Sequence, residues 1–304
     1  MTEKSKKSAN DRIEELVNQS GLGLEEFVHG NLKEYFHSIR RNAHYLDKDK
    51  QTDREIDFLA SYACYVIPPK KKKEKAVVVL IDLILECKKA PDHAWIFSGE
   101  ETDRMSIFEK TVKVKFHPGV IMPEYVTTEP LPDDKEIQEI IPPITQKIFS
   151  ADGYQEIILT DQSKGKTGNK EPNYFLRKAI LQVTKATRHR IEYEKTKNLT
   201  YLKRVKKPTS ITLTFFQPVI VFEGMMFKTT NKDDKLKISP ISFARIEKEY
   251  LTAAHNETEG EIHIVAKDYF PSYLKMLKKH YKIMDIKNEF NDLFLSENNR
   301  EGFL

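Results

Sequence analysis

The sequence is poor in cysteine and has no long apolar run. Its two cysteines, Cys64 and Cys87, cannot form a zinc site alone, and such sparse use suits a reducing compartment. No stretch approaches the roughly 18 apolar residues that a membrane-spanning helix needs. Residues 1–10 are polar and rich in Lys and Ser, without the apolar segment of a secretory signal. We therefore expect a cytoplasmic protein with no membrane span.

The chain also has little net charge. Its 50 basic and 46 acidic residues leave a formal net charge of +4, which argues neither for nor against a polyanionic partner. Hydrophobic residues make up 39% of the chain and charged residues 32%, which is enough for a real core under a densely charged surface. The length of 304 residues fits one elaborated domain or two.

Several common catalytic motifs are missing. No pair of histidines has the spacing of a zinc-binding helix, and no Gly-x-Ser-x-Gly elbow is present. Gly165-Lys166-Thr167 looks like the end of a phosphate-binding loop, but Thr160 stands where the first glycine of that loop is required. Nucleophilic serine chemistry and P-loop nucleotide binding are therefore not indicated.

Two apolar runs stand out in the first third of the chain. Residues 58–67 and 76–85 are rich in β-branched and aromatic side chains, and a link of prolines and charged residues, 68–75, separates them. This pattern predicts a long β-hairpin.

The register of that hairpin predicts a charged cluster at its open end. A turn centred between Lys71 and Lys72 places Asp57 opposite Glu86, and the alternation of side chains puts Glu86 and Lys88 on one face. Burying two carboxylates and an ammonium together is costly unless the charges pair or bind a cation.

Asp57, followed by Glu86-Cys87-Lys88 at the end of an apolar strand, resembles the PD-(D/E)xK motif of the restriction-endonuclease-like nuclease superfamily. The form Arg54-Glu55-Ile56-Asp57 is similar to that of a group of bacterial restriction-endonuclease-like proteins, many of them uncharacterised. Ile56 replaces the nominal proline of the motif and leaves the metal ligand intact. The resemblance covers about residues 24–97, with weaker similarity over 173–224.

The resemblance implies a nuclease that hydrolyses phosphodiester bonds, most often in DNA, with Mg²⁺ or Mn²⁺ as cofactor. Asp57 and Glu86 would supply two carboxylate ligands and Cys87 a backbone carbonyl, while Lys88 would hold the attacking water. The alternative is a surface ion pair between Lys88 and Glu86 or Asp57. That alternative explains one pair, but not two acids that converge beside an apolar strand.

Two helices offer further site residues. Glu25 lies near the start of a helix predicted over 24–40, three residues before Val28 and so on its apolar stripe. In the resembled group an acid here often completes the site; otherwise Glu25 is a first-turn acid favoured by the helix dipole. Gln182 borders the inner face of a helix predicted over 172–194, where resembled nucleases often place Gln or Lys. Otherwise it lies on a helix edge, as we expect for Lys178 and Lys185.

The order of helix, three strands, helix and strand predicts an α/β fold. The resemblance implies a restriction-endonuclease-like core, with a central mixed sheet flanked by helices, and an inserted or appended lobe. We expect a disordered tail over 1–9, the core over 10–224 with an insertion at 98–170, and an α/β extension of the same domain over 225–304.

Two other functional classes stay open. The chain could be a catalytically inactive nuclease-fold protein that binds nucleic acid or a partner protein, or an unrelated α/β protein in which the hairpin charges are incidental. The sequence does not specify DNA or RNA, strandedness or target sequence. A homodimer is plausible because nucleases of this type often pair subunits to cut two strands, and a partner protein could supply targeting. Restriction, anti-phage defence or repair are the settings that the resemblance suggests.

Overall fold

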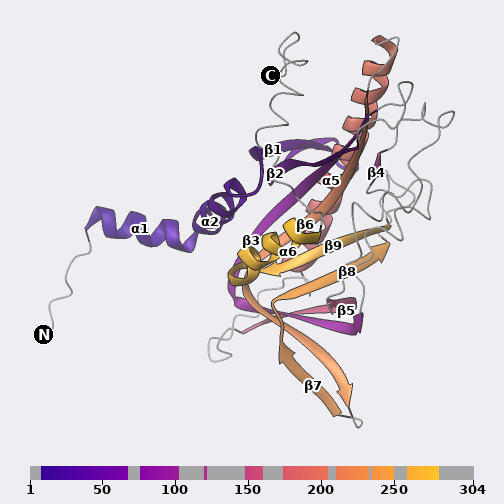
Figure 1. Ribbon diagram of the computed structural model, residues 1–304. Coiled ribbons are helices and arrows are strands. Elements are labelled where there is room, and N and C mark those ends of the chain that lie inside the picture. Colours follow the sequence, from indigo (N-terminus) through magenta and orange to yellow (C-terminus); the bar gives the residue numbers. More distant parts are fainter. Residues whose placement is uncertain are drawn as a thin grey trace, which may run out of the picture.

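The computed structural model describes residues 8–67, 76–102, 120–121, 148–159, 174–204, 210–232, 235–249 and 259–280. The protein is an α/β structure in which helices pack on a large mixed sheet (Figure 1). Within the described ranges, no helix is long and apolar enough to cross a membrane. The helices are α1 (Ala9–Gln19), α2 (Leu22–Lys33), α5 (Tyr174–Arg204) and α6 (Phe270–His280), with the short 3-10 helix η3 (Lys267–Tyr269) before α6.

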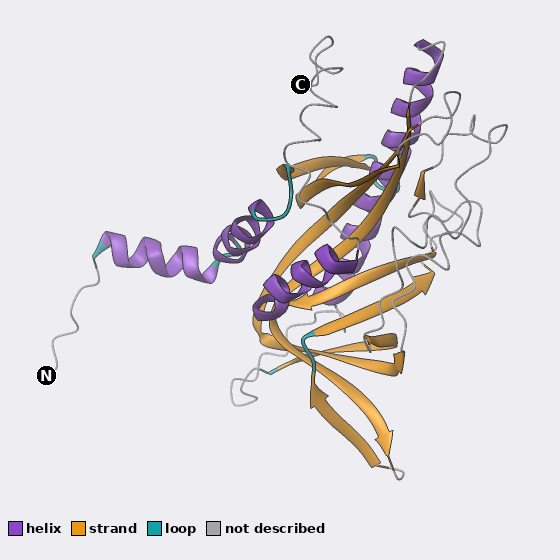
Figure 2. Cartoon of the chain, in the orientation of Figure 1, coloured by secondary structure: helices purple, strands orange, loops and turns teal. Residues whose placement is uncertain are grey.

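The strands differ greatly in length, and the longest of them form the centre of the sheet (Figure 2). They are β1 (Ser38–Asp47), β2 (Thr52–Ile67), β3 (Ala76–Thr102), β4 (Val120–Ile121), β5 (Ile148–Ile158), β6 (Ser210–Lys232), β7 (Lys235–Pro240), β8 (Phe243–Glu249) and β9 (Glu259–Ala266). The sheet runs in the order β1-β2-β3-β5-β8-β9-β6-β4, and β7 pairs with β6.

Strands β2 and β3 form the predicted hairpin. They are antiparallel, with Phe58 opposite Leu85 and Ala63 opposite Leu80. This is the register expected from a turn centred between Lys71 and Lys72, so the prediction is confirmed for residues 58–63. An irregularity between Ala63 and Tyr65 then shifts the outer half of the ladder by one residue. The turn itself, 68–75, lies outside the described residues.

Strand β3 pairs with β2, β6 and β5 over different parts of its length. It runs parallel to β6 from Ala76 onward, and beyond Lys89 it pairs with β5 in the antiparallel sense. The pairings β3–β5, β5–β8, β8–β9, β9–β6 and β6–β3 close a ring of five strands. A ring leaves few strand edges free to pair with other chains.

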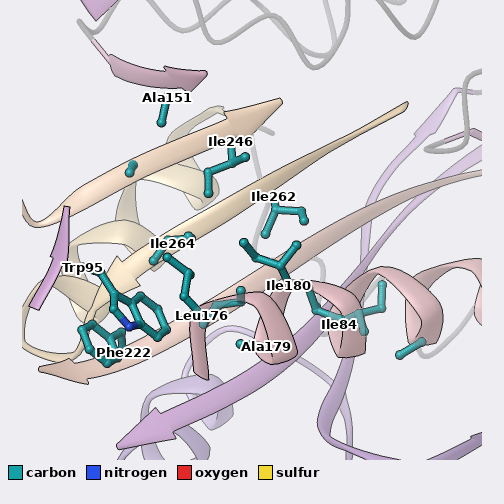
Figure 3. Packing of buried hydrophobic residues seen from close by; sticks show 14 of the residues in the cluster. Ile84, Trp95, Ala151, Leu176, Ala179, Ile180, Phe222, Ile246, Ile262 and Ile264 are labelled. Atoms are coloured by element: carbon teal, nitrogen blue, oxygen red, sulfur yellow. The ribbon is translucent and has the colours of Figure 1, made fainter. Parts of the chain in front are cut away.

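Helix α5 covers one face of this sheet. Leu176, Ala179 and Ile180 on α5 pack toward Ile84 of β3 and Ile264 of β9 (Figure 3). In the same cluster the Trp95 ring is fully buried and stacks on Phe222, with centroids 3.6 Å apart. The single tryptophan of the chain therefore serves core packing.

Helices α2 and α6 contribute to a second core cluster. Leu24, Val28 and Leu32 of α2 are buried with Phe58 and Leu85 of the hairpin. Leu85 belongs to this cluster and its neighbour Ile84 to the other, as alternation along a strand requires. Strand β3 is thus buried on both faces, which explains its nearly continuous apolar sequence.

The helix predicted over 24–40 is shorter than expected. Helix α2 ends at Lys33, and β1 begins at Ser38. The apolar spacing of Phe36 and Ile39 fits a helical stripe, but Phe36 is buried in the core while Ile39 pairs with Ala60 in the β1–β2 ladder. Local periodicity was therefore overridden by strand pairing. The helix predicted over 172–194 runs from Tyr174 to Arg204.

Candidate active site

An acidic cluster lies where the β2–β3 ladder ends. The last paired residues of the ladder are Phe58 and Leu85. Beyond them the Cys87 backbone N–H donates to Oδ2 of Asp57 over 2.6 Å, and the Lys88 ammonium donates to Oε1 of Glu86. The structure therefore brings together Asp57, Glu86 and Lys88 at the open end of the hairpin.

The surroundings of Glu86 disfavour the ionised form of its carboxylate. The residue is only 1% exposed, and its second oxygen, Oε2, has no hydrogen-bond partner within the described part of the chain. Burial, and then the charge of Asp57, raise the pKa of Glu86 from 4.5 to about 8, although Lys88 and Lys178 act in the opposite direction. A cation at this carboxylate would relieve the cost, because buried charges require partners.

Asp57 is better satisfied than Glu86. Burial raises its pKa, but the hydrogen bond from Cys87 and the charge of Lys88 favour the ionised form. The Cys87 thiol is a poor candidate for a nucleophile. Burial and the neighbouring carboxylates of Asp57, Glu86 and Glu25 raise its pKa well above the ordinary value, so the reactive thiolate is disfavoured.

Glu25 on α2 lies within electrostatic reach of this cluster. Burial and the charge of Asp57 raise the pKa of Glu25, whereas Arg41 and Lys88 favour its ionised form. The Arg41 guanidinium lies 3.9 Å from Glu25 and forms a closer ion pair, 2.6 Å, with Glu26. Packing of the Leu24 and Val28 side chains against the hairpin core positions this part of α2.

Gln182 lies beside the cluster and contacts the backbone of β2. Its side-chain amide donates to the carbonyl of Glu55 over 3.0 Å, which ties α5 to β2 two residues before Asp57. Another α5 residue, Lys178, influences Glu86 directly through its charge. Lys178 is itself exposed, as expected for a lysine on the edge of this helix.

Tyr45 on β1 is a neighbour of the site that the motif does not reveal. It is 4% exposed, and its pKa is raised first by burial and then by the charges of Glu86 and Asp47. Tyr45 pairs with Arg54 in the β1–β2 ladder, three residues before Asp57. The sequence did not single out Tyr45, because the resemblance assigns no residue there.

His93 follows the motif closely in sequence but has a structural role. Its Nδ1 lies 2.6 Å from Oε1 of Glu156 on β5, and the other oxygen of Glu156 accepts a hydrogen bond from the Phe175 backbone N–H at 2.9 Å. Glu156 thereby satisfies a free N–H group in the first turn of α5 and holds the buried imidazole. This arrangement fixes the start of the helix that carries Lys178 and Gln182.

The cluster contains oxygen donors of the kind that Mg²⁺ prefers. Among the described residues, no three or more His, Cys, Asp or Glu side chains gather in a metal-binding arrangement. Mg²⁺ needs fewer protein ligands than that, because it prefers oxygen and retains several waters. Asp57 and Glu86 supply hard oxygen donors, and the unpartnered Oε2 of buried Glu86 is an acceptor to which a cation would be suited.

Comparison with known proteins adds nothing to this site: no protein-family model, curated protein or solved structure matches the chain.

Proposed function

We propose that this protein is a metal-dependent nuclease of the PD-(D/E)xK type that hydrolyses phosphodiester bonds, with DNA as the favoured substrate. The observation that carries the proposal is the state of Glu86. This carboxylate is buried, has one oxygen without a hydrogen-bond partner among the described residues, and adjoins both Asp57 and Lys88. A purely structural ion pair would satisfy the buried carboxylate instead of leaving it incomplete.

Each residue of the cluster would have its own role in phosphodiester hydrolysis. Asp57 and Glu86, with the Cys87 carbonyl, would hold Mg²⁺ or Mn²⁺, which supplies Lewis acidity and lowers the pKa of water. Lys88 would orient the attacking water and offset negative charge that develops on the phosphate. The water oxygen forms a bond to phosphorus, the bond to the leaving oxygen breaks, and a proton passes to that oxygen.

The fold is compatible with the core that the resemblance implies. Helix α2, strands β1, β2 and β3, helix α5 and strand β6 occur in that order, with β6 parallel to β3. The parallel pairing aligns Glu86 with Ile220 and Lys88 with Phe222, so the motif continues a strand that pairs with β2 as far as Leu85 and with β6 beyond it. A rigid central strand suits a site that must hold its ligands in a fixed geometry.

Cleavage assays test this function directly. We expect purified protein to cut plasmid or linear DNA when Mn²⁺ or Mg²⁺ is present and to lose cutting when EDTA is added. Single-stranded DNA and RNA, incubated in parallel, define the substrate class. Glu86→Ala provides the matched inactive control. Equal cutting by wild type and Glu86→Ala, or no cutting of any of these substrates by wild type, would overturn the proposal.

A further inference from the structure

The end of β6 and strand β7 form a two-stranded ribbon that extends from the body of the molecule (Figure 1). The ribbon comprises residues 227–232 of β6 and 235–240 of β7. On its other side, β6 pairs with β3 only as far as Thr229, so the outer part of the ribbon has no third strand among the described residues. Such a ribbon buries little apolar surface and contributes little to the core.

The pairing register gives this ribbon two chemically different faces. Residues directly opposite each other share a face, and successive pairs alternate between faces. One face carries lysine and hydroxyl side chains from the pairs Lys228–Ser239 and Thr230–Lys237, and the register continues it to the Cα partners Lys232 and Lys235. We call this the basic face.

No acidic residue occupies the described register positions of the basic face, while Asp233 and Asp234 link its two strands in the sequence. Lys237 is exposed and makes no ion pair within the described residues, while Lys228 pairs with Glu101 at the base of the ribbon.

The opposite face of the ribbon is apolar at its outer end. Leu236 is 70% exposed and Ile238 is 53% exposed, and their register partners are Asn231 and Thr229. These outer pairs contain no aromatic side chain, whereas proteins that bind single strands stack bases on aromatic rings. A two-stranded ribbon does fit the major groove of duplex DNA, which is about 12 Å wide.

The ribbon also lies within reach of a duplex held at the candidate active site. Glu86 is aligned with Ile220, and β6 continues for 12 more residues to Lys232. At about 3.3 Å per residue, this path spans at most about 40 Å, close to one turn of B-form DNA. A duplex whose scissile phosphate lies near Glu86 could therefore contact the ribbon about one turn away.

We infer that the ribbon is a duplex-binding arm, whose basic face holds the phosphates of double-stranded DNA while the hairpin site cuts it. This inference rests on the proposed nuclease function for the cleavage step, but binding by the arm can be measured without cleavage. It defines the substrate class of the site as double-stranded.

Binding in EDTA tests the arm separately from catalysis. Fluorescence anisotropy would measure full-length protein binding to a labelled duplex of about 21 base pairs, two helical turns, and to a single strand of the same sequence. Lys237→Glu is expected to weaken duplex binding roughly three- to tenfold and to reduce the slope of log affinity against log salt by about 1. Leu236→Ser, on the other face, and Lys50→Glu, in the exposed β1–β2 turn, are expected to stay within about twofold of wild type.

Each other outcome has a defined meaning. The proposal of a duplex-binding arm would be overturned by any of three results. These are no duplex binding by wild type, tighter binding of the single strand than of the duplex, or unchanged duplex binding by Lys237→Glu. If Leu236→Ser lost as much duplex affinity as Lys237→Glu, the proposal would also be overturned, because binding would then depend on the apolar face and resemble a contact with a protein. Cleavage assays with Mn²⁺, run in parallel, separate the two proposals. If wild type and Lys237→Glu cut DNA equally well, only the proposed arm is contradicted. If Lys237→Glu weakens duplex binding but wild type does not cut, only the proposed nuclease function is contradicted.

Discussion

Glu86 has an environment that stability alone would not select. It is buried beside a second carboxylate, and the Lys88 ammonium contacts only one of its oxygens. The like charge of Asp57 adds to the cost of burial in raising the pKa of Glu86. Sites with such conflicts are common where a protein binds a cation or performs chemistry.

Substitution of Lys88 should separate catalysis from metal binding. Lys88→Ala is expected to remove most cleavage while Mn²⁺ affinity, measured by calorimetry, changes little, because its interaction matters mainly in the transition state. Asp57→Ala should weaken Mn²⁺ binding itself, since it removes a ligand. Neither change should greatly lower the melting temperature. Unchanged cleavage by Lys88→Ala would contradict its role, and a collapse in melting temperature would favour a structural ion pair.

The stability of the metal-free protein should fall as pH rises. The pKa of Glu86 is about 8 in the folded protein, against 4.5 ordinarily, so the folded state retains a proton that the unfolded state has released. This contribution to stability is full below about pH 4.5 and is lost as pH rises through about 8, by at most about 1.4 kcal/mol per pH unit.

Glu86→Gln cannot ionise and should therefore remove that dependence. Urea unfolding in EDTA at about pH 5, 7 and 9 would compare the two proteins, and the variant is expected to gain stability relative to wild type as pH rises. Parallel pH profiles for wild type and Glu86→Gln would show that Glu86 is not buried as a protonated acid.

At the scale of elements, the central β3–β6 ladder contains an irregularity next to a glycine. The β3–β6 register shifts between Lys89 and Ala94, opposite Gly224 on β6. A Cβ at Gly224 would lie 2.2 Å from the Phe222 ring and 2.6 Å from the Ala90 carbonyl oxygen. Glycine is therefore required where the two backbones and the Trp95–Phe222 stack approach each other.

Alanine at this position should destabilise the fold. Gly224→Ala is expected to lower the free energy of unfolding by about 1–3 kcal/mol, because the backbone carbonyl cannot move aside cheaply. Gly30→Ala is the matched control in helix α2, where a Cβ meets no atom within 4 Å, and it should stabilise by about 0.5–1 kcal/mol. Chemical denaturation of both variants would check the pair, and equal stability would contradict the close packing at Gly224.

The sequence predicted the β2–β3 hairpin well because its information is local. Apolar alternation and the composition of the link were sufficient to place Phe58 opposite Leu85, and this register brings Asp57 near Glu86. It did not predict the end of α2, because Phe36 and Ile39 fit a helical stripe and a strand equally well. It also missed Tyr45, because the proximity of Tyr45 to Glu86 depends on how β1 packs on the sheet.

For the whole molecule, the five-strand ring joins segments far apart in the chain. Strand β5, from the region expected to be an insertion, and strands β8 and β9, from the expected C-terminal extension, all pair within the same sheet as the motif strand β3. Composition could not reveal this closure, because pairing between distant strands leaves no local signal. The consequence is that the candidate site rests on a sheet that most of the described chain helps to build.

The position of a bound divalent metal would test the central proposal most directly. Crystals of the wild-type protein grown with Mn²⁺ should show an anomalous scattering peak between the carboxylates of Asp57 and Glu86, with the Cys87 carbonyl as a further ligand. Lys88 should have left Oε1 of Glu86, and Asp57→Ala should remove the peak. Fully occupied Mn²⁺ elsewhere, with the Lys88–Glu86 contact intact and no peak at this pair, would contradict the proposed metal-dependent nuclease.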